Sequence, residues 1–145
     1  MAKKNTFYGA TMLESAVSAY YPGDPDFDHF VFQQMMLDPS KPDDDYTLIV
    51  YAVNSAQVPV LLSPLTPVNG NPKSAGEKAH FANMRLDAVG LVNLYPNGVN
   101  SDMLIMPTGF YPGTEYIQYT AYTLDNPDTG AGGGVPINPS PPYNG

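Results

Sequence analysis

Three carboxylates at alternate positions, Asp24, Asp26 and Asp28, are the residues of this sequence best suited to hold a metal. Calcium takes about six to eight oxygen ligands, and alternate acidic residues open many calcium-binding loops. The match then fails, because such a loop needs glycine and later glutamate where this chain has His29 and Met35. We therefore expect solvated acidic turns and no cofactor, with a weak calcium site as the alternative.

The histidines raise the possibility of a different metal site, formed by His29 and His80 with Asp28 as a carboxylate ligand. Nothing in their spacing brings them together, so we expect each to be an ordinary turn or strand-end residue. No serine has the Gly-x-Ser-x-Gly context of a hydrolase nucleophile, and cysteine is absent. Paired catalytic carboxylates are defined by geometry and stay open. Our prediction is that the chain is not an enzyme.

The charge balance argues against nucleic acid and membrane partners. The chain carries a net charge of −8 and only six basic residues, which are scattered, whereas a nucleic-acid binder needs a basic footprint. No apolar run is long enough to insert into a bilayer. Asn5, Thr6, Gly9 and Glu14 interrupt any apolar core of a signal peptide, so we expect cytoplasmic synthesis.

The composition favours short strands joined by turns. Proline and glycine contribute 16 and 13 residues, and there are 11 tyrosines but no tryptophan. Turn formers and aromatic residues are typical of β-rich folds. Only 14% of the residues are charged, against about 25% in an average domain. Low charge with many tyrosines also fits a surface made for protein contacts.

Several segments predict strands. Residues 46–53 (YTLIVYAV) are nearly all apolar or β-branched, which is typical of a strand buried on both faces. Further strands are expected at residues 30–37, 102–106 and 116–124. Residues 57–68 contain three prolines, which predicts an edge strand or an extended connector.

Two segments are ambiguous between helix and strand. In residues 11–20, Thr11 and Glu14 have the spacing of a capping box, but the apolar and aromatic residues fit a strand equally well. In the second segment, alternation predicts a strand at residues 84–88, and a further strand is expected at 91–95. A helix over residues 78–89 is the alternative there.

The order of an apolar strand, a Pro-Gly turn and a long Tyr/Thr strand over residues 102–125 resembles the last hairpin of many immunoglobulin-like and fibronectin-like sandwiches. The resemblance implies a fold class and not a function. We expect an all-β protein, an antiparallel β-sandwich that is immunoglobulin-like or jelly-roll-like, with room for one short helix near residues 12–20. The Cys…Trp…Cys signature of true immunoglobulin domains is absent.

Three regions are expected along the chain. Residues 1–10 form an N-terminal arm, residues 11–125 the β-sandwich domain, and residues 126–145 an extended Pro/Gly-rich tail. The tail is poor in large apolar side chains and is not expected to order by itself. We therefore expect the tail to be an arm that docks on a neighbouring copy.

The expected partner-binding residues lie in the tail and on the tyrosine-rich strand. They are Val135, Ile137, Tyr143, Tyr116 and Tyr122. These features together predict a structural protein that self-assembles as a homo-oligomer or with other structural subunits. A virion accessory, decoration or fibre protein is an example of this class. The alternative is a ligand-binding module for a carbohydrate, or for calcium bound weakly.

Overall fold

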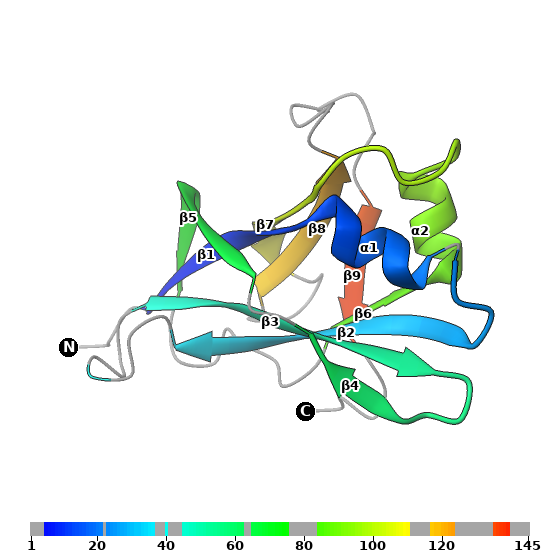
Figure 1. Cartoon of the computed structure of the whole chain (residues 1–145). Coiled ribbons are helices and arrows are strands. Elements are labelled where there is room, and N and C mark those ends of the chain that lie inside the picture. Colours follow the sequence, from blue (N-terminus) through cyan, green and yellow to red (C-terminus); the bar gives the residue numbers. More distant parts are fainter. Residues whose placement is uncertain are drawn as a thin grey trace.

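The computed structural model describes residues 5–21, 23–36, 40, 45–62, 65–75, 84–110, 117–123 and 135–139. Strands dominate this part of the chain, so the prediction of a mainly β protein is confirmed (Figure 1). The elements are, in order, β1 (Asn5–Met12), α1 (Glu14–Tyr20), β2 (Phe27–Met36), β3 (Asp45–Asn54), β4 (Pro59–Leu61), β5 (Thr66–Ala75), β6 (Met84–Asp87), α2 (Ala88–Leu94), β7 (Met103–Phe110), β8 (Ile117–Thr123) and β9 (Val135–Pro139).

The described strands form one curled sheet of nine strands in the order β4-β3-β2-β6-β9-β8-β7-β1-β5. The sheet curls far enough for β1 to pair with β3 as well, so the pairing closes on itself. This additional pairing is parallel, so the prediction of an entirely antiparallel fold is wrong at this point. The expected two-sheet sandwich is not confirmed, because all the described strands belong to one sheet.

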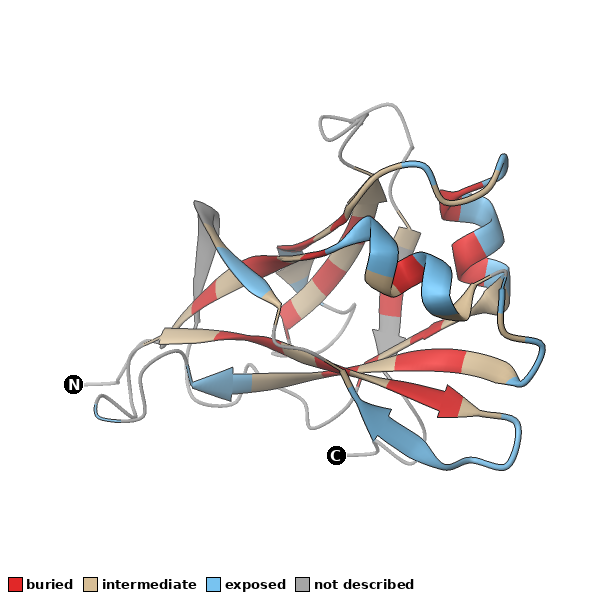
Figure 2. Ribbon diagram, viewed as in Figure 1, coloured by how far each residue is buried: buried red, intermediate tan, exposed pale blue. Residues whose placement is uncertain are grey.

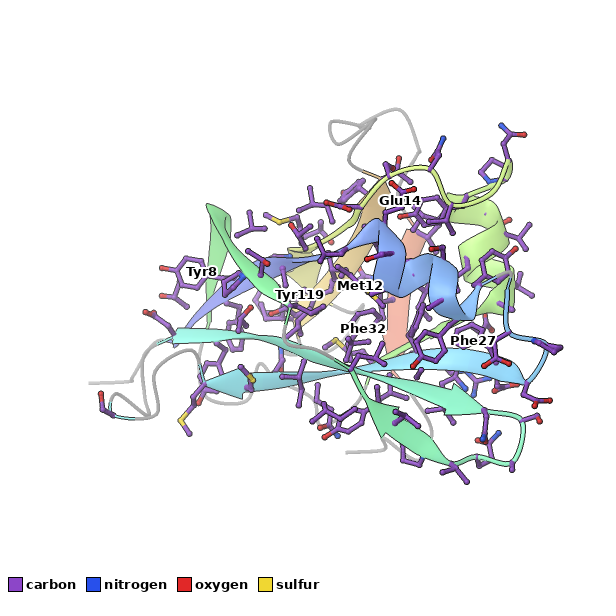
Figure 3. All side chains as sticks on the ribbon, viewed as in Figure 1. Tyr8, Met12, Glu14, Phe27, Phe32 and Tyr119 are labelled. Atoms are coloured by element: carbon purple, nitrogen blue, oxygen red, sulfur yellow. The ribbon has the colours of Figure 1, made fainter. Side chains whose placement is uncertain are left out.

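The hydrophobic core fills the space that the curled sheet encloses (Figure 2). Side chains alternate between the two faces of a strand, so every second residue points inward. On β2, Phe30 and Phe32 are fully buried, while Val31 between them is half-buried. Figure 3 shows Met12, Phe32 and Tyr119 meeting in this interior from three different strands.

β3 is a core strand, but it is not buried equally on both faces. Leu48 and Val50 point inward and are almost completely buried. Ile49 and Tyr51 point outward and are only half-buried. Thr47 and Val53 on the same face are buried, so on this face the prediction of a strand buried on both faces is wrong only at Ile49 and Tyr51. Part of this outer face lines a groove described below.

The closure between β1 and β3 depends on close approach of main chains. The Phe7 and Tyr46 rings stack with their centroids 5.3 Å apart. The buried hydroxyl of Thr47 donates a hydrogen bond to the Gly9 carbonyl at 3.3 Å. Glycine is needed here because a Cβ at residue 9 would lie 2.4 Å from the main-chain oxygen of Ile105. The absence of a side chain thus lets β1 contact both β3 and β7.

α1 confirms the helix alternative for the first ambiguous segment, but over Glu14–Tyr20. Thr11 lies in β1, so the predicted capping box does not form. The helix instead receives its cap from a distant residue, since the Glu14 N–H donates to Asp102 Oδ1 at 2.7 Å. A carboxylate at the start of a helix satisfies a free N–H group and interacts well with the helix dipole.

Replacing Asp102 by alanine should therefore lower the free energy of unfolding by about 1 kcal/mol, the usual value for loss of a helix cap. Urea denaturation measures this loss. Asp102→Asn keeps an oxygen acceptor and should lose about half as much, since only the charge is removed. Equal stability of the alanine variant and the unmodified chain would show that the contact does not hold α1.

α2 corrects the prediction of a strand at residues 91–95. Asp87 caps this helix, because its Oδ1 accepts a hydrogen bond from the Gly90 N–H at 3.0 Å. Leu91 and Leu94, one helical turn apart, are both buried. A Cβ at Gly90 would lie 2.6 Å from the Leu86 side chain, so glycine allows α2 to pack closely on β6. The alternative helix over 78–89 is wrong for residues 84–87, which form β6.

β9 corrects the prediction of an extended tail. Residues 135–139 lie in the middle of the sheet, where β9 pairs with β6 on one side and β8 on the other. Ile137 sits opposite Tyr119 and is fully buried. Part of the predicted tail therefore belongs to the folded body. The two described helices, with seven residues each, are far too short to cross a bilayer.

Candidate functional site

Two of the three carboxylates near the start of β2 have partners within the protein. Asp24 Oδ1 accepts a hydrogen bond from the Asp26 N–H at 2.8 Å, which stabilises the turn. Asp28 points elsewhere, toward His29 and Arg85. Within the described residues, no group of three or more potential ligands is placed to hold a metal ion. His80 lies outside them, as do residues 41–44.

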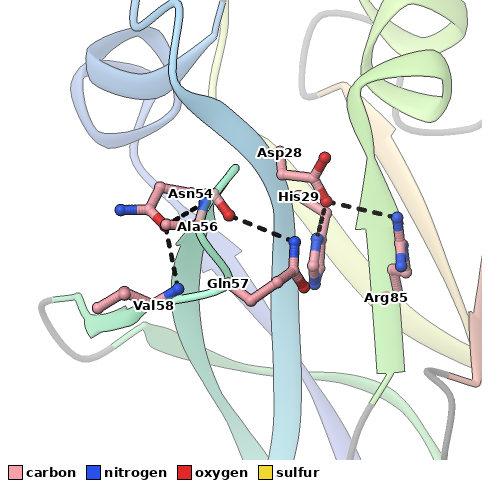
Figure 4. Close-up of polar contacts among 7 residues, drawn as sticks. All are labelled: Asp28, His29, Asn54, Ala56, Gln57, Val58 and Arg85. Carbon is pink, nitrogen blue, oxygen red and sulfur yellow. Dashed lines mark hydrogen bonds and ion pairs between the residues drawn. The ribbon is translucent and has the colours of Figure 1, made fainter.

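Asp28 and His29 form a tight pair at the start of β2 (Figure 4). The distance between His29 Nδ1 and Asp28 Oδ2 is 2.6 Å, and Arg85 Nη2 lies 3.5 Å from the same oxygen. The His29 side chain is only 5% exposed, whereas that of Asp28 is 38% exposed. The imidazole is thus held under the surface by a carboxylate that remains in contact with solvent.

The pair defines which nitrogen of His29 carries a proton. The hydrogen bond from His29 lowers the pKa of Asp28, and the charge of Arg85 acts in the same direction against the opposing effect of burial. An ionised carboxylate only accepts hydrogen bonds, so Nδ1 of His29 must donate. In the neutral imidazole, Nε2 is then a hydrogen-bond acceptor.

The β3–β4 loop lies beside the Asp28–His29 pair. Asn54 Oδ1 accepts hydrogen bonds from the Ala56 and Val58 N–H groups, each at 3.0 Å, and orders the turn (Figure 4). The Ser55 N–H donates to the Asp26 carbonyl at 2.8 Å, which ties the loop to the acidic turn. Gln57 has φ of 64°, a left-handed conformation that glycine adopts most easily.

A groove of about 420 Å³ lies on the outer face of the sheet beside this loop. We call it the outer groove, and its walls come from alternate residues of β2 and β3 with the start of β4. The lining residues are His29, Val31, Gln33, Tyr51, Val53, Gln57 and Pro59. Amides, an imidazole and a phenol ring line it together with apolar side chains. None of these is a serine, threonine, cysteine or carboxylate, so the described lining offers no obvious covalent chemistry.

A second cleft, of about 310 Å³, lies where β6, α2 and β9 meet. Its polar groups include Arg85 and Asp87, and Val135 closes one side. Both charged groups already have partners, since Arg85 pairs with Asp28 and Asp87 caps α2. The second cleft is therefore a weaker candidate for a binding site than the outer groove.

Of the partner-binding residues expected from the sequence, the structure describes Val135, Ile137 and Tyr122, which lie on the paired strands β9 and β8. Ile137 is buried inside its own chain, which leaves no side-chain surface for a neighbour. Val135 is half-buried in the second cleft, and Tyr122 is half-buried on β8. Tyr116 and Tyr143 lie outside the described residues.

The residues that build the outer groove were not recognised from sequence. His29 was interpreted as an ordinary strand-end residue, and Tyr51 and Gln57 carried no signal of their own. The adjacency of Asp28 and His29 was the one available hint, because neighbouring residues are always close in space. No family model matches this chain, nor does any curated protein or solved structure.

Proposed function

We propose that this chain is a structural subunit that assembles with copies of itself through the outer edge of β4, which no described strand covers. The observation that supports this proposal is the exposure of apolar side chains along that edge. Val58, Val60 and Leu61 are 51%, 51% and 58% exposed, respectively. Figure 2 shows β4 as a continuous exposed strand beside the buried bands of β3.

The main chain of β4 also has hydrogen-bonding groups to offer. The Asn54 N–H donates to the Val58 carbonyl, and the Leu62 N–H donates to the Val50 carbonyl. Hydrogen bonding alternates along an antiparallel pair, so the N–H and carbonyl of Leu61 point away from β3. An added strand can pair with these groups while covering the apolar side chains.

The composition of this edge lacks one usual protection against pairing, charged side chains, although the strand is short and begins with Pro59. Natural edge strands carry charged side chains, often lysine, that oppose pairing with another chain. Residues 55–62 contain no charged residue, although the whole chain has a net charge of −8. Copies that each carry this negative charge repel one another. Salt screens the repulsion, so assembly should strengthen as the salt concentration rises.

Light scattering of the purified chain at increasing concentration tests the proposal. We expect a mass above that of the monomer, and Val60→Lys should reduce association at least tenfold because it places charge on the edge. Val92→Lys is the matched control, since Val92 is 48% exposed on α2, and it should leave association unchanged. A monomer at all concentrations, or equal effects of the two variants, would contradict edge assembly.

A further inference from the structure

The outer groove has the lining of a small-molecule site. Its volume of about 420 Å³ lies within the range of about 300–1,000 Å³ that is usual for ligand pockets. Such pockets combine apolar walls with a few polar groups that fix the orientation of the ligand. The geometry points to the outer groove as a binding site for a neutral, polyhydroxylated ligand the size of one sugar ring. The groove borders the β4 edge at Pro59, but the ligand inferred for it is a different partner from the second copy proposed for that edge.

The outer groove offers no fixed counter-charge to an ionic ligand among its described residues. Its described lining contains no lysine, arginine, aspartate or glutamate, and Asp28 is already paired with His29 and Arg85. A charged ligand would lose its hydration without gaining a counter-charge. A net charge of −8 adds repulsion against anions. A neutral ligand avoids both the loss of ionic hydration and the repulsion by the net charge.

The polar floor of the groove favours hydroxyl groups. Nδ1 of His29 is engaged with Asp28, so Nε2 is the ring nitrogen that this pair leaves for a ligand in the groove. A ligand hydroxyl can both donate and accept, so it can pair with this nitrogen in either protonation state. It can also donate to the amide oxygen of Gln57, whose Nε2 donates to the Asn54 carbonyl at 3.5 Å. The Tyr51 ring and the Pro59 side chain supply apolar surface for the C–H face of a sugar ring.

The conformation of Gln57 points independently to this groove. It is the one non-glycine residue with positive φ in the described part of the chain. Its N–H donates to the Asn54 carbonyl at 2.8 Å in a tight turn, a position where glycine costs least. Strained residues of this kind gather at binding sites, where the side chain is needed despite the cost. Gln57 thus places an amide in the groove despite the conformational cost of its positive φ.

Isotope-edited NMR of the full chain tests this inference. The probes are methyl glycosides of neutral hexoses and N-acetylhexosamines, with sodium acetate and methylammonium chloride as charged controls. We expect at least one glycoside to shift the ring signals of His29 and Tyr51 in a saturable way. Both charged controls should leave these signals unchanged. If no glycoside shifts them, or the charged controls shift them equally, the inference is overturned.

Variants then separate binding from folding. His29→Ala should weaken glycoside affinity about tenfold, but this nearly buried residue also affects folding. Gln57→Gly removes the amide and relieves the strained φ, so it should weaken binding several-fold while raising the melting temperature by a few degrees. Val92→Ala, on α2, is the control and should change neither. Unaltered glycoside affinity in Gln57→Gly would overturn the role of this groove.

Discussion

Replacing Gly9 by alanine should lower the free energy of unfolding by about 3 kcal/mol, the upper end for overpacking of a core. The added Cβ would lie 2.3 Å from Met106 Sδ and 2.4 Å from the Ile105 carbonyl oxygen. The methionine side chain can move, but the main chain of Ile105 is paired with β1 and cannot. Chemical denaturation measures the loss.

Gly109→Ala provides a matched control on the neighbouring strand β7. Nothing lies within 4 Å of a Cβ built at Gly109. Its replacement should leave stability unchanged, or raise it by a few tenths of a kcal/mol through lower entropy of the unfolded chain. If Gly9→Ala is as stable as Gly109→Ala, β1 does not approach β7 as closely as the structure places it.

Ile137→Ala should cost about 2–5 kcal/mol, the range for truncating a large aliphatic side chain in a packed core. Ile137 is fully buried in β9, opposite Tyr119 of β8. Removing its side chain leaves a cavity between strands that meet in the middle of the sheet. Urea denaturation measures the cost, with Val89→Ala as the control because Val89 is 68% exposed.

The concentration dependence of that loss distinguishes two roles of the C-terminal segment. If Ile137 packs inside its own chain, the loss is the same at all protein concentrations. An anchor on a neighbouring copy would give a stability that rises with concentration, because association then contributes to folding. A loss that appears only at high concentration would support the docking arm expected from the sequence.

Local patterns in the sequence were enough to locate the main strands. Apolar and β-branched runs predicted strands at residues 30–37 and 46–53, where β2 and β3 lie. On β8, the expected alternation holds, with Ile117, Tyr119 and Ala121 on the buried face. The prolines of residues 57–68 correctly predicted an edge, which is β4. The spacing of apolar residues and the positions of prolines are local properties of the sequence, so they predict strands and edges without knowledge of the fold.

Contacts between distant residues account for the features that local patterns left open or did not predict. α1 is capped by Asp102, which lies 88 residues from Glu14. β9 contains two prolines and few apolar residues, so it has little strand propensity of its own. It is a strand because β6 and β8 lie on both sides of it and bury Ile137. Tertiary packing here overrides local preference.

Composition and local pattern are enough to establish the β-rich character, the low charge and the lack of a nucleophile motif or basic footprint. They do not reveal that β1 closes the sheet against β3, or that the outer face of β2 and β3 is hollowed into a groove. The physical reason is that sheet curvature and burial depend on which strands pair. His29 became a buried residue of the groove because Asp28 holds its ring and the β3–β4 loop lies beside it.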